Sequence, residues 1–82
     1  MIRIEKQTDI SPQTVIDRAV AFFGPGGYGL AVEECGPYCA RFEGGGGHVN
    51  VDITDCVDEP GSKIEIEGRE WERQIREFLG EL

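Results

Sequence analysis

The alternation of apolar and polar residues divides the chain into short strands and two helices. Ile2 and Ile4 alternate with charged residues, which predicts an N-terminal strand with one buried face. Over residues 12–23 apolar positions instead recur every three or four residues, which predicts a helix that begins after an N-cap at Ser11 and ends before Gly24. A second helical stripe near the C-terminus comprises Trp71, Ile75, Phe78 and Leu79.

The middle of the chain predicts a three-stranded meander, because two turns permit registers that match apolar residues with apolar ones. With residues 36–38 as a three-residue hairpin loop, the predicted cross-strand pairs are Val32 with Phe42, Glu33 with Arg41, and Cys35 with Cys39. With residues 44–47 as a four-residue loop, the predicted pairs are Phe42 with Val49, Ala40 with Val51, Glu43 with His48, and Arg41 with Asn50.

One more strand completes the set. Ile64 and Ile66 alternate with charged residues over residues 63–67, and Gly68 is expected to end this strand. These apolar faces can be buried together in a two-layer α+β fold of order β-α-β-β-β-β-α, with both helices on one face of a five-stranded antiparallel sheet. We expect strand order 1-5-4-3-2, because hairpins join strands 2 to 5 and the first strand then needs a partner. Residues 1–82 are expected to form a single domain.

The order of these elements is similar to that of helix-grip proteins (the START and polyketide-cyclase-like superfamily). Those proteins open with a strand, a short polar link and a Ser-Pro pair that begins a helix. The resemblance rests on Ser11, Pro12, Val15 and Ile16, and on the closing amphipathic helix with Trp71 and Phe78. The order is also similar to one half of a TATA-binding-protein-like fold. The helix-grip resemblance implies a small apolar ligand bound between sheet and helix.

The charge of the chain narrows the classes of partner. Sixteen acidic and eight basic residues give a net charge of −8, and the excess is spread along the whole sequence. Nucleic-acid binding needs a basic footprint, which is missing, and anionic membrane surfaces are disfavoured for the same reason. There is no apolar run of the ~20 residues that a spanning helix needs. With no apolar signal segment at the N-terminus, a soluble cytoplasmic protein is expected.

Three residues form a candidate metal site, namely Cys35, Cys39 and Asp52, which the predicted registers place in one row. Thiolates and carboxylates are zinc ligands, and a bent-back Cys56 could join them. His48 lies four residues from Asp52 along a strand, about 13 Å at ~3.3 Å per residue, so one ion cannot reach both. A disulfide between Cys35 and Cys39 is an alternative, and reduced thiols without a cofactor are the default expectation.

The single histidine is expected to be a solvated strand residue. A general base needs a positioned partner and a pocket, and no serine or cysteine nucleophile accompanies His48 in the sequence. The sequence therefore predicts a protein that is not an enzyme.

Three functions remain open. The favoured one is a non-catalytic binding or assembly module for an unknown protein partner or a second copy. It would act through the polar outer face of the sheet, with Glu33, Arg41, Glu43, His48, Asn50, Asp52 and Glu65, or through a groove beside the C-terminal helix, with Trp71, Ile75, Phe78 and Phe42. The alternatives are a helix-grip-like binder of a small apolar ligand, and a metal- or thiol-dependent protein that uses Cys35 and Cys39.

Overall fold

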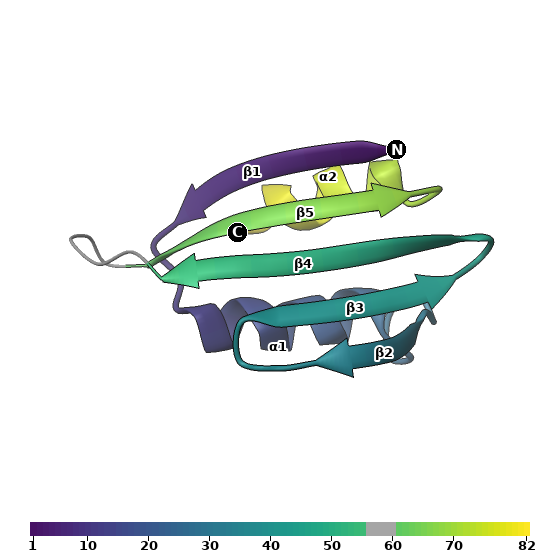
Figure 1. Cartoon of the computed structure of the whole chain (residues 1–82), viewed down its shortest axis with the longest axis horizontal. Helices are drawn as coiled ribbons and strands as arrows, with labels where there is room; N and C mark the ends of the chain where they lie inside the picture. The colour runs from purple at the N-terminus through teal and green to yellow at the C-terminus, as the bar shows by residue number, and fades with distance from the viewer. Residues whose placement is uncertain (56–60) are drawn as a thin grey trace.

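A computed structural model describes residues 1–55 and 61–82 as one antiparallel sheet backed by two helices (Figure 1). The strands are β1 (Ile2–Thr8), β2 (Ala31–Cys35), β3 (Cys39–Gly44), β4 (Gly47–Asp55) and β5 (Ser62–Arg69), and the helices are α1 (Pro12–Phe23) and α2 (Glu72–Gly80). The predicted element order and the strand order β1-β5-β4-β3-β2 are both confirmed. No helix in the described ranges is long and apolar enough to cross a membrane.

The hairpin of β3 and β4 has the predicted register, with Phe42 opposite Val49 and Glu43 opposite His48. Its loop is shorter than expected, because Gly44 and Gly47 pair as strand residues. Gly45 and Gly46 alone make the turn, at φ angles of 59° and 80°. Positive φ at both central residues is the requirement of a type I′ turn, which matches the twist of the flanking strands.

The hairpin of β2 and β3 departs from the predicted register after its first pairs. Val32 lies opposite Phe42 as predicted, but the register then shifts by one residue at a β-bulge. The predicted pairs of Glu33 with Arg41 and of Cys35 with Cys39 are therefore wrong. The observed pairs are Glu34 with Arg41 and Cys35 with Ala40, and the N–H of Gly36 donates to Cys39 O, 2.9 Å away, around a tighter turn.

Both helices lie on the same face of the sheet (Figure 1), and the buried apolar side chains form one cluster between the two layers. Alternation along the strands sends every second side chain to this face. From the helices the cluster takes Val15, Ile16, Ala19, Phe23, Ile75, Phe78 and Leu79, and from the strands Ala40, Phe42, Val49, Val51, Ile53, Ile64 and Ile66.

The last strand does not end at Gly68, as the alternation pattern had suggested, but continues to Arg69. Gly68 pairs with Ile2 on one side and with Val49 on the other. A Cβ atom on Gly68 would come well within 3.0 Å of Cδ1 of Ile75, which real Cβ atoms do not do. The glycine thus lies where α2 and the backbone of β4 both approach closely, and it does not interrupt the strand.

Candidate binding site on the outer face of the sheet

The face of the sheet opposite the helices carries polar side chains in rows that cross the strands. Residues that pair across neighbouring strands point to the same face, so the registers define these rows directly. The first row is Ala31, Glu43, His48 and Arg69; the second row is Glu34, Arg41, Asn50, Glu67 and Arg3; the third row is Cys39, Asp52, Glu65 and Glu5.

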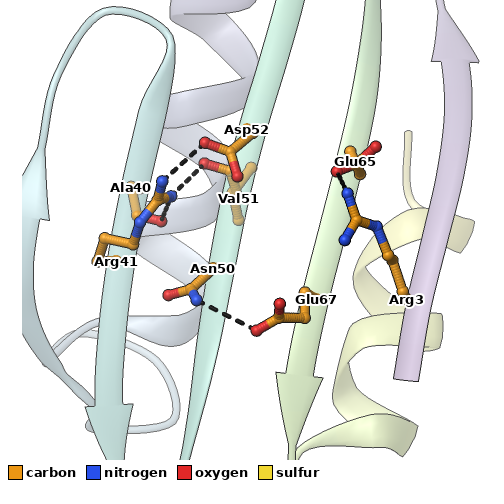
Figure 2. Close-up of polar contacts among 8 residues, drawn as sticks. All are labelled: Arg3, Ala40, Arg41, Asn50, Val51, Asp52, Glu65 and Glu67. Carbon is orange, nitrogen blue, oxygen red and sulfur yellow. Dashed lines mark hydrogen bonds and ion pairs between the residues drawn. The ribbon is translucent and has the colours of Figure 1, made fainter. Parts of the chain in front are cut away.

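The third row brings three carboxylates side by side, which would destabilise the sheet if they stayed unpaired. Each of them instead has a cation from another position on the face. Nη2 of Arg41 lies 2.8 Å from Oδ1 of Asp52, and Arg3 forms an ion pair with Glu65 (Figure 2). The remaining carboxylate, Glu5, lies 3.5 Å from Nζ of Lys63. The charges of the third row are therefore compensated within the chain.

Arg41 is held by more than its carboxylate. Its Nη1 also donates to the backbone oxygen of Val51 at 3.2 Å (Figure 2). The hydrogen bond to Asp52 is the largest cause of a raised pKa at Arg41, so this guanidinium is charged under all ordinary conditions.

Glu67 joins the second row to the first. Its Oε1 lies 2.8 Å from Nε2 of His48 and 3.3 Å from Nδ2 of Asn50 (Figure 2 shows the second contact). An ionised carboxylate only accepts hydrogen bonds, so Nε2 of His48 carries the proton in this contact. The bond from His48 is the largest cause that lowers the pKa of Glu67. The imidazole is thereby held in one orientation between Glu43 and Arg69.

Two charged members of the first row, Glu43 and Arg69, lie on either side of His48. Within the part of the chain that the structure describes, neither Glu43 nor Arg69 has an ion pair or a side-chain hydrogen bond, and both are exposed. They border a hollow of about 590 Å³, together with His48 and Asn50. The rest of its lining is Gly44, Gly46 and Gly47, so the backbone of the turn is accessible there.

The turn beside this hollow is fixed from the helix side by Trp71, which immediately precedes α2. Nε1 of Trp71 donates to the backbone oxygen of Gly44 at 2.8 Å. The indole lies so close to Gly45 that a Cβ atom there would be 2.7 Å from Cζ2 of the ring. Trp71, the single tryptophan of the chain, therefore contacts the turn that lines the hollow and can report on its occupation.

The predicted metal ligands do not assemble. Cys39 lies opposite Asp52, but the bulge moves Cys35 opposite Ala40, and the Asp52 carboxylate is paired with Arg41. In residues 1–55 and 61–82, no three His, Cys, Asp or Glu side chains are grouped so that they could hold a metal ion. Cys35 and Cys39 are free thiols, and Cys56 lies outside the described residues.

Most of the predicted groove beside α2 belongs to the core. Phe42, Ile75 and Phe78 are each exposed by 2% or less, and Trp71 is half-buried against the turn. The hollow that does lie beside α2 has a volume of about 350 Å³ and is located between α1 and α2. Its lining consists of Phe78 with Arg18, Ala21, Phe22, Glu81 and Leu82.

Sequence reasoning missed Arg69 and Glu67 as members of the outer face. If Gly68 ended the strand, as the sequence suggested, Arg69 would belong to the solvated side of the C-terminal helix. The available signal was the alternation of Lys63, Glu65, Glu67 and Arg69, which continues through the glycine. No protein-family model, no curated protein and no solved structure matches this chain.

Proposed function

We propose that this chain is a non-catalytic binding module that holds a polar segment of a partner protein in the hollow at the first row. One observation carries the proposal: Glu43 and Arg69 are unpaired among the described residues on either side of His48, whereas the three carboxylates of the third row each have an ion pair within the chain. Both side chains are exposed, so their charged groups are accessible to a partner. A partner's side chains can complete these two pairs.

The spacing of the first row defines the chemistry of that partner. Residues paired across antiparallel strands have Cα atoms about 4.5–5.5 Å apart, so Glu43 and Arg69 lie roughly 10 Å apart with His48 between them. The Arg69 guanidinium suits a carboxylate, which it can bind with two parallel hydrogen bonds. Glu43 suits a cation. We therefore propose a partner segment that carries one acidic and one basic side chain a short distance apart.

The lining of the hollow supports binding without catalysis. The described residues around it include no Ser, Thr, Cys or Lys that could act as a nucleophile. Nε2 of His48 is bound to Glu67, and the other lining groups are the glycine turn, Asn50, Glu43 and Arg69. Pockets for small organic ligands are mostly apolar, whereas the four side chains here are all polar.

Selection of peptides from a random displayed library against the purified protein tests this proposal. We expect the selected peptides to combine an acidic and a basic residue and to change Trp71 fluorescence on binding. Arg69→Ala and Glu43→Ala should each weaken the binding about 10-fold or more, since a hydrogen bond to a charged group contributes about 1.5–3 kcal/mol.

Arg76→Ala is the matched control, because Arg76 is an exposed arginine of α2 that does not line the hollow. It should leave the affinity unchanged. Peptides whose affinity is the same for wild type, Arg69→Ala and Glu43→Ala would show that the first row is not the site.

A second candidate function, binding of a small apolar ligand, is favoured by the hollow between α1 and α2. Phe22 and Phe78 have ring centroids 5.4 Å apart there, and Arg18 lies at the rim, where it suits a carboxylate head group. Titration with a medium-chain fatty acid tests it. Binding that is abolished by Ala21→Trp, which fills the hollow, would support this function, and the absence of any heat or shift in the wild type would reject it.

A further inference from the structure

The two edges of the sheet differ in how they are protected. β2 is short, contains the bulge between Val32 and Glu34, and is followed by Pro37, all of which discourage further strand pairing. β1 is longer, pairs with β5 over all seven residues without a register shift, and contains no proline. On its other side no strand lies among the described residues, and β1 forms the border of the molecule in Figure 1.

A free, regular edge can pair with a second copy of itself. A two-fold axis perpendicular to the sheet makes the two β1 strands antiparallel and keeps both sets of helices on the same side. Residues directly opposite each other must then point to the same face. One residue of β1 must therefore lie opposite its own copy, and the axis passes midway between the two. The candidate centres in the middle of the strand are Arg3, Ile4, Glu5 and Lys6.

Charge distinguishes these four registers. A centre at Arg3, Glu5 or Lys6 places that residue opposite its own copy, so each sets like charges directly against each other. A centre at Ile4 places Arg3 opposite Glu5 of the second copy, and by symmetry this favourable pair occurs twice. On the helix side it places Ile4 opposite Ile4 and Ile2 opposite Lys6.

We infer that β1 is a self-complementary edge, and that a second copy of this chain pairs along it with Ile4 on the two-fold axis to form a continuous ten-stranded sheet. The third row of one copy, which ends at Glu5, continues into the second row of the other copy, which begins at Arg3. The acidic row is thus extended by a cation. This interface is separate from the hollow, because neither Glu43 nor Arg69 belongs to β1.

The side chains of Arg3 and Glu5 are accessible for this pairing. The side chains of Arg3 and Glu5 remain 63% and 54% exposed despite their pairs with Glu65 and Lys63. An inward-pointing lysine commonly blocks an edge strand, and Lys6 points inward. Its Nζ, however, donates to the backbone oxygen of Leu79 in α2, so the ammonium group is already bound to the helix of its own chain.

Charge reversal at the edge tests the inference on the full chain by sedimentation velocity over a concentration series. The wild type should show a monomer–dimer equilibrium. Arg3→Glu sets a carboxylate against a carboxylate at both symmetric positions, and Glu5→Arg sets a guanidinium against a guanidinium. Each should raise the dissociation constant about 10-fold or more, which corresponds to ~1.4 kcal/mol.

Mixing the two variants gives the sharper result. In Arg3→Glu both edge positions are acidic, and in Glu5→Arg both are basic, so the two variants complement each other at both symmetric contacts. An equimolar mixture should therefore form a heterodimer that native mass spectrometry resolves by its mass. Arg41→Glu is the matched control, because it breaks an ion pair of the same face, with Asp52, away from β1. Its dimerisation should equal that of the wild type. Circular dichroism checks that each variant is folded.

Three results would each overturn the inference. A wild-type chain that stays monomeric over the whole series would show that the edge does not pair. Single variants that dimerise like the wild type would place the interface elsewhere. A dimeric wild type whose charge-reversed variants fail to form a heterodimer would reject the register centred on Ile4.

Discussion

The contact between Gly68 and Ile75 allows the packing of α2 on the sheet to be tested with a single methyl group. Gly68 lies in β5 directly beneath the helix, and a Cβ atom there would come well within 3.0 Å of Cδ1 of Ile75, which is completely buried. The same Cβ would lie 2.9 Å from the backbone oxygen of His48, and a backbone atom cannot rotate away as a side chain can. Gly68→Ala therefore meets two obstacles, the last methyl group of Ile75 and the backbone of β4.

The size of the effect follows from two opposing contributions. Overpacking a filled core costs about 1–3 kcal/mol, and replacing glycine by alanine inside a strand returns about 0.5–1 kcal/mol of conformational entropy. We expect Gly68→Ala to lower the free energy of unfolding by about 1–2 kcal/mol. Ile75→Val removes the obstructing Cδ1 atom and by itself should cost about 0.5–1.5 kcal/mol.

The double variant Gly68→Ala/Ile75→Val should then recover the part of the loss that the Ile75 methyl group causes, because the new methyl group occupies space that the old one has left, while the contact with the backbone oxygen of His48 remains. The two changes should couple by roughly 1 kcal/mol or more in a double-mutant cycle. Urea unfolding followed by Trp71 fluorescence and by circular dichroism measures all four proteins. Gly26→Ala is the control and should be nearly neutral, because a Cβ atom there has nothing within 4 Å.

Additive effects of the two substitutions, with coupling below about 0.3–0.5 kcal/mol, would refute this reasoning. That outcome would mean that the backbone oxygen of His48 or the position of α2 as a whole, and not the one methyl group, excludes a side chain at Gly68.

Three further changes have expected outcomes. Gly80→Ala, at the last residue of α2, where a Cβ atom meets nothing within 4 Å, should raise the urea midpoint, with a gain of up to ~1 kcal/mol in helix propensity; a lower midpoint would contradict it. Trp71→Phe leaves the backbone oxygen of Gly44 without its 2.8 Å donor and should cost about 0.5–1.5 kcal/mol, with faster amide exchange in the turn; unchanged exchange would show that the indole does not hold the turn. Glu67 has a lowered pKa in the folded protein, so its stabilising contribution is complete above its ordinary pKa of about 4.3 and is lost as the pH falls through the lowered value. Thermal midpoints from neutral pH to about pH 3 should therefore fall more steeply for the wild type than for Glu67→Gln, and parallel curves would argue against the contact with His48.

The sequence was sufficient to predict the sheet wherever cross-strand pairs had only one consistent register. The β3–β4 register follows from matching Phe42 with Val49 and Ala40 with Val51, whatever the length of the glycine loop. The bulge in β2 could not be predicted in this way, because a one-residue shift still sets Glu34 against Arg41 and so keeps opposite charges together. The end of β5 was predicted wrongly at Gly68, because the sequence does not distinguish a glycine that ends a strand from a glycine that leaves room for a packed helix.

The candidate site was predictable only in part. Once the register is known, the rows of the outer face follow, and with them the position of His48 between Glu43 and Arg69. Which charges remain unpaired depends on where long side chains settle, and Arg41 could equally have reached Glu43 on its own strand. The hollow also depends on three glycines that lack side chains, so its volume is a property of the folded turn.

The two proposals have a joint geometric consequence. The first row lies at the end of the sheet where β1 begins, because Ile2 pairs with Gly68 next to Arg69. A two-fold axis at Ile4 reverses the direction of β1 in the second copy, so the two hollows would lie at opposite ends of the ten-stranded sheet. They would open to the same side, because the axis keeps both outer faces together. A partner with two copies of the recognised segment could then engage both hollows at once and gain affinity without any new contact, provided that its linker spans the sheet. Self-association through β1 would thus convert one modest polar site into a bivalent surface.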